Sequence, residues 1–338
     1  MIKQNTVFIL GAGASAPYNF PTGYNLNWKI IDNFRSRMTK IAHGKNPYMV
    51  DNLDKEIAVF LDQFKGTPQT SIDLFLNRHR SIPFFSELGK KAIILSLLDS
   101  EKESLVYFTR RNNAGNWYSS IFQYMLNGLE NPDSYKQFGD NKITFITFNY
   151  DRSLEYYLHY SLSKNFSETL KDENKEAYKE VINKINIIHV YGQLGPLPWQ
   201  NKMSASPISS TRIESLGYGE TTIDYDYLNL LTEYIQTIPE RISIPKGDPI
   251  WEALAYAEHI FFLGFSFGEE NMNMLKETIN NIPQHTSIYC TVKGLEQIKI
   301  DKIWNQYFNT HFPNGWRRHV WKTEDMDSDA LLKKYLLD

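Results

Sequence analysis

Short runs of β-branched and aromatic residues alternate along the chain with longer stretches in which apolar residues recur every three or four positions. The short runs predict buried strands, because such residues pack well on a pleated surface. The longer stretches predict helices with one apolar face, as in Ile57, Phe60, Leu61 and Phe64. The predicted strands cover residues 6–10, 142–148, 186–190, 259–263, 287–292 and, most weakly, 318–321.

Strands that alternate with helices are typical of a mainly parallel, doubly wound sheet. The strands are almost continuously apolar, as over 260–263, which indicates that helices cover both faces of the sheet. The pattern therefore predicts a Rossmann-like α/β fold. We expect one domain over 1–338, with a large helical insertion at 17–140, the rest of the core at 141–292 and a C-terminal segment at 293–338.

Two segments between predicted strands are irregular. Residues 163–184 are rich in lysine and glutamate and predict a solvated helix or loop. Residues 195–219 are rich in proline, serine and glycine and follow a strand end, where loops that cover a substrate often lie.

Composition narrows the class of protein. Hydrophobic residues make up 42% and charged residues 22%, as in ordinary globular proteins, and the net charge of −3 argues against direct nucleic-acid binding. The single cysteine, Cys290, excludes a disulfide within the chain and a cysteine-built zinc site. The apolar run after Met1 is too short for a signal peptide, and no segment approaches the roughly 20 apolar residues of a membrane span. We therefore expect a soluble, cytoplasmic protein without a membrane partner.

The first predicted strand breaks into a glycine turn, Gly11-Ala12-Gly13-Ala14-Ser15-Ala16. Glycines there let the backbone turn tightly and approach a phosphate, although such turns also serve plain strand-to-helix connections. A dinucleotide-binding dehydrogenase also needs an acidic residue at the end of a second strand. Asp32 has the spacing but lies in a helical pattern, so hydride transfer is disfavoured.

Later strands end in polar or glycine-containing turns that would meet at the carboxyl edge of the sheet, where ligands of such folds bind. Asn149 and Asp151 follow one strand, His189 and Gly192 the next, and Gly264-Phe265-Ser266-Phe267-Gly268 a third. We therefore expect an amide, a carboxylate and an imidazole beside a nucleotide.

Each of these residues also has a plainer interpretation. Asp151 precedes a helical pattern and suits a helix cap, and His189 suits a buried imidazole whose nitrogens are satisfied. The turn around Ser266 matches a hydrolase nucleophile elbow, which would require an acid and a histidine downstream. No metal site is expected, because the other histidines show no ligand spacing: His43, His79, His159, His259, His285, His311 and His319.

The order of these motifs resembles that of the sirtuin superfamily, above all the bacterial sirtuin-like domains of antiphage defence systems, whose activity is NAD cleavage. The resemblance rests on the glycine turn from Gly11 to Ser15, on residues 147–151, on His189 with Gly192, and on Gly264 with Ser266. It implies that the turn and Gly192 bind NAD and that the turn meets the pyrophosphate. It also implies that Asp151 shapes the nicotinamide pocket and that Gly264 and Ser266 touch the adenosine half. The residues that would bind NAD are thus Gly11, Ala12, Gly13, Ser15, Asp151, Gly192, Gly264 and Ser266.

The resemblance assigns the chemistry to Asn149 and His189. An imidazole can serve as a base, and an amide can hold water without adding charge. The chain departs from protein deacylases because it lacks their four-cysteine zinc module, and residues 19–24 replace the family's Asp-Phe-Arg segment. We therefore expect NAD as a substrate and no zinc.

The expected activity is an NAD+ glycohydrolase that releases nicotinamide and ADP-ribose and depletes NAD+ in antiphage defence. The alternatives are a catalytically silent module that binds NAD or ADP-ribose and, less favoured, an NAD-dependent deacylase. A constitutive NADase would harm its own cell, so we expect gating by self-assembly into a homo-oligomer or by a separate partner. The resemblance suggests a HerA-like ATPase as that partner, and the insertion and the C-terminal segment are the expected interfaces.

Overall fold

A computed structural model describes residues 1–67, 71–109, 116–166, 175–200, 213–241, 243–309 and 321–336. Its centre is a six-stranded sheet in the order β3-β2-β1-β4-β5-β6, in which every pairing is parallel. This is the strand order of a doubly wound fold. The strands are β1 (Thr6–Leu10), β2 (Ile143–Thr147), β3 (Asn186–His189), β4 (His259–Leu263), β5 (Ser287–Thr291) and β6 (Trp321–Glu324). The predicted Rossmann-like α/β fold is confirmed.

The centre of the sheet is an apolar core on β1, whose five residues are all buried. Phe8 stacks between Phe145 of β2 and Phe261 of β4, with ring centroids 5.2 Å apart in each pair. These rings lie at the same register, so each of the central strands contributes one aromatic side chain to a common row. A row of this kind fixes the register, because a slip by one residue would turn every ring to the other face.

The sequence located most strands to within one or two residues. The exception is β6, which runs to Glu324 and shares only Trp321 with the predicted strand, while residues 318–320 lie outside the described residues. The irregular segment expected at 163–184 contains the end of α7 (Ser153–Asn165) and α8 (Lys175–Asn183), and 167–174 lie outside the described residues. Residues 201–212 of the loop expected to cover a substrate are likewise outside them.

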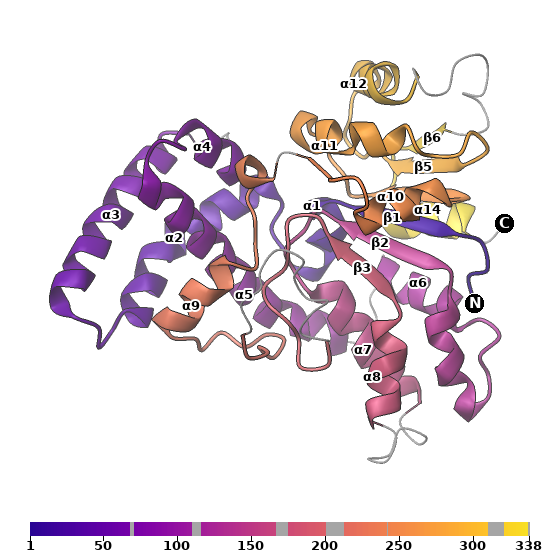
Figure 1. Ribbon diagram of the computed structural model, residues 1–338, viewed down its shortest axis with the longest axis horizontal. Coiled ribbons are helices and arrows are strands. Elements are labelled where there is room, and N and C mark those ends of the chain that lie inside the picture. The colour runs from indigo at the N-terminus through magenta and orange to yellow at the C-terminus, as the bar shows by residue number, and fades with distance from the viewer. Residues whose placement is uncertain are drawn as a thin grey trace.

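A lobe of helices lies beside the sheet, on the left in Figure 1. It contains α2 (Gly23–Ile41), α3 (Pro47–Lys65), α4 (Ile72–Arg78) and α5 (Pro83–Thr109), which pack on one another. Its core is a cluster of phenylalanine rings with centroids 4.9–6.0 Å apart, made of Phe34, Phe60, Phe64, Phe75 and Phe85. Local signals start these helices: Asn46 accepts a hydrogen bond from the backbone N–H of Tyr48, and Pro47 occupies the first turn of α3.

The lobe and the segment 17–140 are not the same set of residues. The helix α6 (Trp117–Leu126) lies within that segment but contacts α7 and α14 (Ser328–Tyr335) beside the sheet. In the other direction, α9 (Tyr225–Thr232) follows β3 yet packs on α5 and completes the lobe (Figure 1). The chain thus crosses between lobe and sheet several times.

The remaining helices flank β4 and β5. The helix α10 (Pro249–Ala255) precedes β4, and α11 (Glu269–Ile279) follows β4. The two helices contact each other. After β5 come α12 (Gln297–Ile303) and a π-helical turn, Trp304–Phe308, that packs on α11. Within the described ranges, none of the helices combines the length and the apolar character that crossing a bilayer requires.

Candidate active site at the carboxyl edge of the sheet

The glycine turn lies at the point where the strand order reverses, between β1 and β4. Gly11 follows β1 and precedes the single-turn helix α1 (Ala12–Ser15), and Gly264 follows β4. The N–H of Gly13 donates to the carbonyl of Gly264 at 2.9 Å, and the N–H of Gly11 donates to the carbonyl of Leu263 at 3.1 Å. The two turns therefore touch through their backbones.

This contact requires glycine on both sides. A Cβ at Gly264 would lie 2.0 Å from the backbone nitrogen of Ala14, and a Cβ at Gly11 would lie 2.7 Å from the carbonyl oxygen of Gly264. Gly264 also has a φ of +55°, in the left-handed region that other residues adopt at a cost. The glycines of both turns thus bring two backbones together at the sheet edge.

A cavity of about 520 Å³, here called the switch-point cavity, opens beside these turns. Four of the predicted NAD-binding residues line it, namely Ala12, Gly13, Gly264 and Ser266. Ligands of open α/β sheets bind at this place, outside the carboxyl ends of the strands where the order reverses. The sequence thus located the cavity from the glycine turn and the turn after β4.

Three further residues in the cavity wall were missed by the sequence analysis. The indole N–H of Trp117 donates to the carbonyl of Ala14 at 2.8 Å and so fixes α1 in place. The hydroxyl of Thr291 accepts the N–H of Gly264 at 2.8 Å and so fixes the second turn. Lys293 follows β5 and is an exposed cation in this wall. Only its position after a predicted strand could have pointed to it.

The backbone donors of the glycine turn are partly occupied. The N–H of Gly13 binds Gly264, and the N–H of Ala14 binds the carbonyl of Gly11 at 2.9 Å. A phosphate in this arrangement would therefore not meet a full cradle of free N–H groups. Lys293 is a second source of positive charge at the same cavity.

Asn149 lies just past the end of β2 and is bonded to the glycine turn. Its side-chain nitrogen donates to the carbonyl of Gly11 at 3.0 Å and to the hydroxyl of Ser15 at 3.1 Å. Its own N–H donates to the hydroxyl of Thr147 at 3.1 Å. The structure thus brings Asn149, Gly11 and Ser15 together, but none of the three is in the wall of the switch-point cavity.

Asp151 is buried at the start of α7. One carboxylate oxygen accepts both the N–H of Ser153, at 3.1 Å, and the hydroxyl of Ser153. Burial raises the pKa of Asp151, and the hydrogen bonds from Ser153 oppose this rise. The N-cap position of α7 is Arg152, which makes no side-chain cap bond, so Asp151 holds the first helical residue from one position before the cap.

His189 ends β3 and is buried, with both ring nitrogens engaged. Nδ1 lies 2.8 Å from the carbonyl oxygen of Asn149, and Nε2 lies 2.6 Å from a carboxylate oxygen of Glu155 on α7. Burial disfavours the charged ring, but the Glu155 carboxylate outweighs it, so the pKa of His189 is raised. Glu155 was missed by the sequence analysis, because its position on a predicted helix carries no signal of the strand-end histidine that it contacts.

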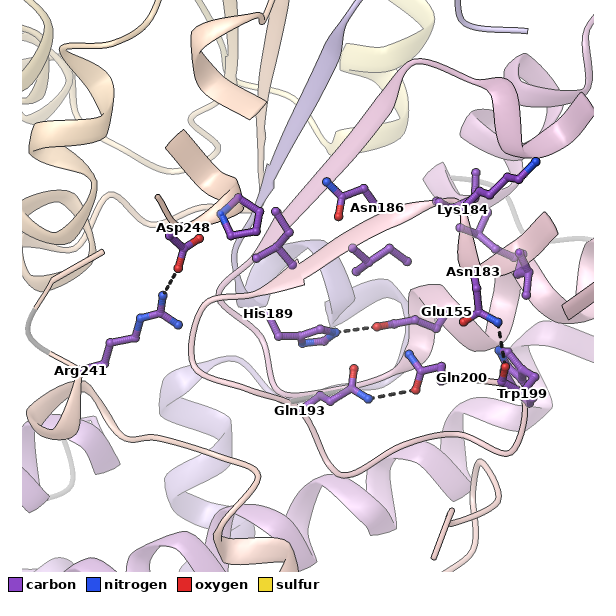
Figure 2. Close-up of a pocket in the computed structure, with 16 residues that line it drawn as sticks. Glu155, Asn183, Lys184, Asn186, His189, Gln193, Trp199, Gln200, Arg241 and Asp248 are labelled. Carbon is purple, nitrogen blue, oxygen red and sulfur yellow. Dashed lines mark hydrogen bonds and ion pairs between the residues drawn. The ribbon is translucent and has the colours of Figure 1, made fainter. Parts of the chain in front are cut away.

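His189 and Glu155 belong to a second cavity of about 400 Å³, here called the sheet-edge cavity. Figure 2 shows the imidazole and the carboxylate facing each other in its wall, with the Arg241–Asp248 ion pair, 2.9 Å long, nearby. The sheet-edge cavity runs along β3, one of the two edge strands of the sheet. Of the predicted residues, His189 alone lines this cavity, whereas Ala12, Gly13, Gly264 and Ser266 line the switch-point cavity. Asn149 lies in neither wall and is hydrogen-bonded both to His189 and to the glycine turn.

Gly192 and Ser266 lie in the turns after β3 and β4. Gly192 has a φ of +80°, and its N–H donates to the carbonyl of His189 at 3.2 Å. Ser266 is exposed to the switch-point cavity, and across the part of the chain that the structure describes no histidine hydrogen-bonds its hydroxyl. His311 and His319, which a hydrolase triad could have used, are outside that part. No cluster of three or more metal-ligating side chains occurs among the described residues.

Two comparisons with known proteins bear on this site. The family model of the SIR2-like domain matches residues 143–312, which is half of the chain. The match begins at β2 and includes Asn149, Asp151, His189, Gly192, Gly264 and Ser266. No curated protein matches the chain.

Proposed function

The chain belongs to the SIR2-like domain family, and from this premise we propose that it binds NAD+ in the switch-point cavity and hydrolyses the bond between nicotinamide and ribose. The SIR2-like family includes enzymes that use NAD+. The observation that carries the proposal is the cavity of about 520 Å³ where the two glycine turns meet. Its place in the fold is where doubly wound sheets bind nucleotides.

The charge of the substrate suggests how it lies in the cavity. The pyrophosphate is anionic, and we place it between Ala12 of the first turn and the ammonium group of Lys293. The adenosine half then lies along Gly264 and Ser266, and the nicotinamide ribose points toward Asn149. Gly11, Gly13, Ser15 and Gly192 shape these turns, and Asp151 holds the start of α7 behind them.

The chemistry needs few groups. Nicotinamide leaves NAD+ as a neutral molecule, so no carboxylic acid has to protonate it, unlike the leaving group of an ordinary glycoside. The protein has to hold the ribose and a water molecule in line, and such positioning can supply several kcal/mol, up to roughly 7–11. We assign this positioning to Asn149, whose amide is already fixed against Gly11 and Ser15.

The proposed role of His189 as a base needs one ring nitrogen to leave its partner. In the observed arrangement Nδ1 holds Asn149 and Nε2 holds Glu155. His189 therefore acts on the substrate through Asn149 unless binding rearranges it. The same observation favours a second candidate function, a module that binds NAD or ADP-ribose without turnover and regulates a partner.

The biological setting of the proposal comes from the resemblance to antiphage systems. A cytoplasmic NADase would deplete the NAD+ of its own cell, so we propose that self-assembly or a HerA-like ATPase gates the activity. The helical lobe is the proposed interface, because it projects from the sheet (Figure 1). The partner's effect can be measured by repeating the assay below in its presence.

The test is a chromatographic assay of NAD+, nicotinamide and ADP-ribose with the purified protein, alone and with the product of the neighbouring gene. Asn149→Ala should lower turnover on the order of 10²-fold, as expected when a positioning group is lost. Asn33→Ala, at an exposed position on α2, is the matched control and should leave turnover unchanged.

The outcomes separate the candidate functions. Binding of NAD+ by calorimetry without turnover, in every condition, would favour the regulatory module. Consumption of NAD+ only with an acetylated peptide would favour a deacylase. Full activity of Asn149→Ala would overturn the assignment of the site.

A further inference from the structure

A series of hydrogen bonds leads from the sheet-edge cavity through Asn149 to the glycine turn beside the switch-point cavity. It runs from the Glu155 carboxylate to His189 over 2.6 Å, and from His189 to the carbonyl of Asn149 over 2.8 Å. The Asn149 side chain continues it to Gly11 at 3.0 Å and to Ser15 at 3.1 Å. A group on α7 is thereby linked to the turn that forms the edge of the switch-point cavity.

The protonation of His189 follows from its partners. A carbonyl oxygen only accepts, so Nδ1 must carry the proton that binds Asn149. Nε2 and the Glu155 carboxylate then share a further proton, because two bare acceptors at 2.6 Å would repel each other. Without that proton, Nε2 and the carboxylate would repel each other, and the ring would keep only its hydrogen bond to Asn149 to fix its orientation.

The pair is almost fully buried, which strengthens this dependence. The side chains of His189 and Glu155 are 5% and 6% exposed. Hydrogen bonds to an ionised group in such a place are stronger than neutral ones, and removing one partner costs more.

We propose that Glu155 is a positioning residue, which through His189 holds the backbone of Asn149 and so the amide that grips the glycine turn. This inference rests on the proposed function, because it assigns Asn149 to the NAD+ site. Glu155 itself does not touch the substrate.

Charged groups other than Glu155 also lie near His189 and influence its protonation. Just before α7 this is Asp151, and Lys184 lies in the wall of the sheet-edge cavity. Across the sheet-edge cavity the Arg241–Asp248 pair is closed on itself. Unlike these groups, Glu155 contacts the ring directly, so its replacement isolates the proposed effect.

The experiment compares wild type with Glu155→Gln, which keeps the shape of the side chain and removes its charge. The ring of His189 is followed by NMR of histidine-labelled protein during a pH titration, and His189→Asn identifies its signal. We expect the pKa of His189 to fall by about one unit or more in Glu155→Gln, because burial remains and the opposite charge is gone. Glu103→Gln, which removes an exposed carboxylate paired with Lys29, is the control and should leave this titration unchanged.

Turnover of NAD+ by the same variants tests the positioning itself. We expect Glu155→Gln to turn NAD+ over roughly tenfold to a hundredfold more slowly than wild type. As the pH is raised, the rate of the variant should begin to decrease at a lower pH than the rate of wild type. Glu155→Asp should recover part of the rate, since it restores the charge.

The results distinguish this inference from the proposed function. If the titration of His189 is the same in wild type and Glu155→Gln, or if the variant turns NAD+ over as wild type does, the inference is wrong while the NADase proposal stands. If wild type neither binds nor cleaves NAD+, the proposed function is wrong, and with it the positioning role. A titration shift together with the altered pH profile supports the inference.

Discussion

Gly264 is the residue on which the contact between the two turns depends. Its φ is +55°, and a Cβ there would meet the backbone of Ala14 at 2.0 Å. Gly294 has a similar φ of +74°, but nothing lies within 4 Å of a Cβ at that position. An alanine at Gly294 would therefore carry only the cost of the left-handed backbone conformation, whereas an alanine at Gly264 would carry that cost and a steric clash as well.

We predict that Gly264→Ala lowers the free energy of unfolding by about 3 kcal/mol or more, because the left-handed conformation and overpacking both contribute. Gly294→Ala should lower it by only about 1–2 kcal/mol, from conformation alone. Urea denaturation of both variants measures the difference. Equal losses would show that the turns are not in close contact.

His159 gives a prediction for the pH dependence of stability. Its ring stacks on the ring of Trp199, with the two ring centroids 3.6 Å apart. Burial lowers the pKa of His159 from 6.5 to about 4. The folded protein then binds fewer protons than the unfolded chain between these two pH values. The stabilising contribution of the neutral ring is complete above pH 6.5 and is lost as the pH falls toward about 4.

We expect wild type to lose about 1–2 kcal/mol more of its free energy of unfolding than His159→Phe between pH 7.5 and pH 4.5. The phenylalanine keeps an aromatic ring beside Trp199 and cannot be protonated. His189 contributes with the opposite sign, since its raised pKa favours the folded state at low pH, but it is the same in both proteins. Denaturation at several pH values tests this, and parallel curves for the two proteins would contradict it.

At the scale of elements, a buried ion pair joins the helical lobe to the sheet. Arg152, just before α7, donates two hydrogen bonds to Glu101 of α5, at 2.9 and 2.7 Å, and both side chains are fully buried. Arg152 also donates to the carbonyl of Leu216 at 3.0 Å. Three segments far apart in the sequence therefore meet at one guanidinium group.

We predict that Glu101→Gln destabilises the protein by about 3–5 kcal/mol, because it leaves a buried guanidinium without its counterion. The control is Asp54→Asn, which breaks the Arg35–Asp54 pair of 2.6 Å on the exposed surface of the lobe. That variant should cost about 1 kcal/mol or less. Thermal unfolding compares the two, and similar losses would show that the buried pair does not join the elements.

The elements also show which parts of the fold the sequence could predict. The core strands are continuous apolar runs, and such runs are local signals that require no knowledge of the partner strand. The assignment of α6 to the sheet and of α9 to the lobe was not predictable in this way. Both helices have apolar faces, and the identity of the surface that covers such a face is decided by tertiary packing.

At the scale of the whole molecule, the switch-point cavity predicts a ligand-dependent gain in stability. NAD+ that binds only the folded protein should raise its stability by about 2.7 kcal/mol at a concentration of 100 times the Kd. Ser266→Trp should abolish most of this gain, because it places a large ring at an exposed position in the cavity wall. Ser81→Trp, exposed on the lobe, should keep the gain. Thermal unfolding with and without NAD+ measures it, and an equal shift in both variants would place the ligand elsewhere.

The candidate site was only partly predictable. The glycine turn, Asn149 and the turn with Ser266 were identified because each follows a predicted strand, and parallel strands end at one edge of a sheet. Glu155 and Trp117 were not, because helical positions carry no signal of the strand-end residue that they will contact. For His189 the sequence left a base and a buried imidazole open, and the structure shows both nitrogens engaged.

By itself the sequence determined five of the six described strands, their mainly parallel arrangement and the edge at which the polar turns gather, because hydrophobic periodicity and glycine positions act through neighbouring residues. Only the tertiary structure decided that Gly264 lies against Gly13 and that His189 lines a different cavity from Ala12, Gly13, Gly264 and Ser266. These features depend on contacts between residues far apart along the chain. Such contacts form only when the helices and strands pack together.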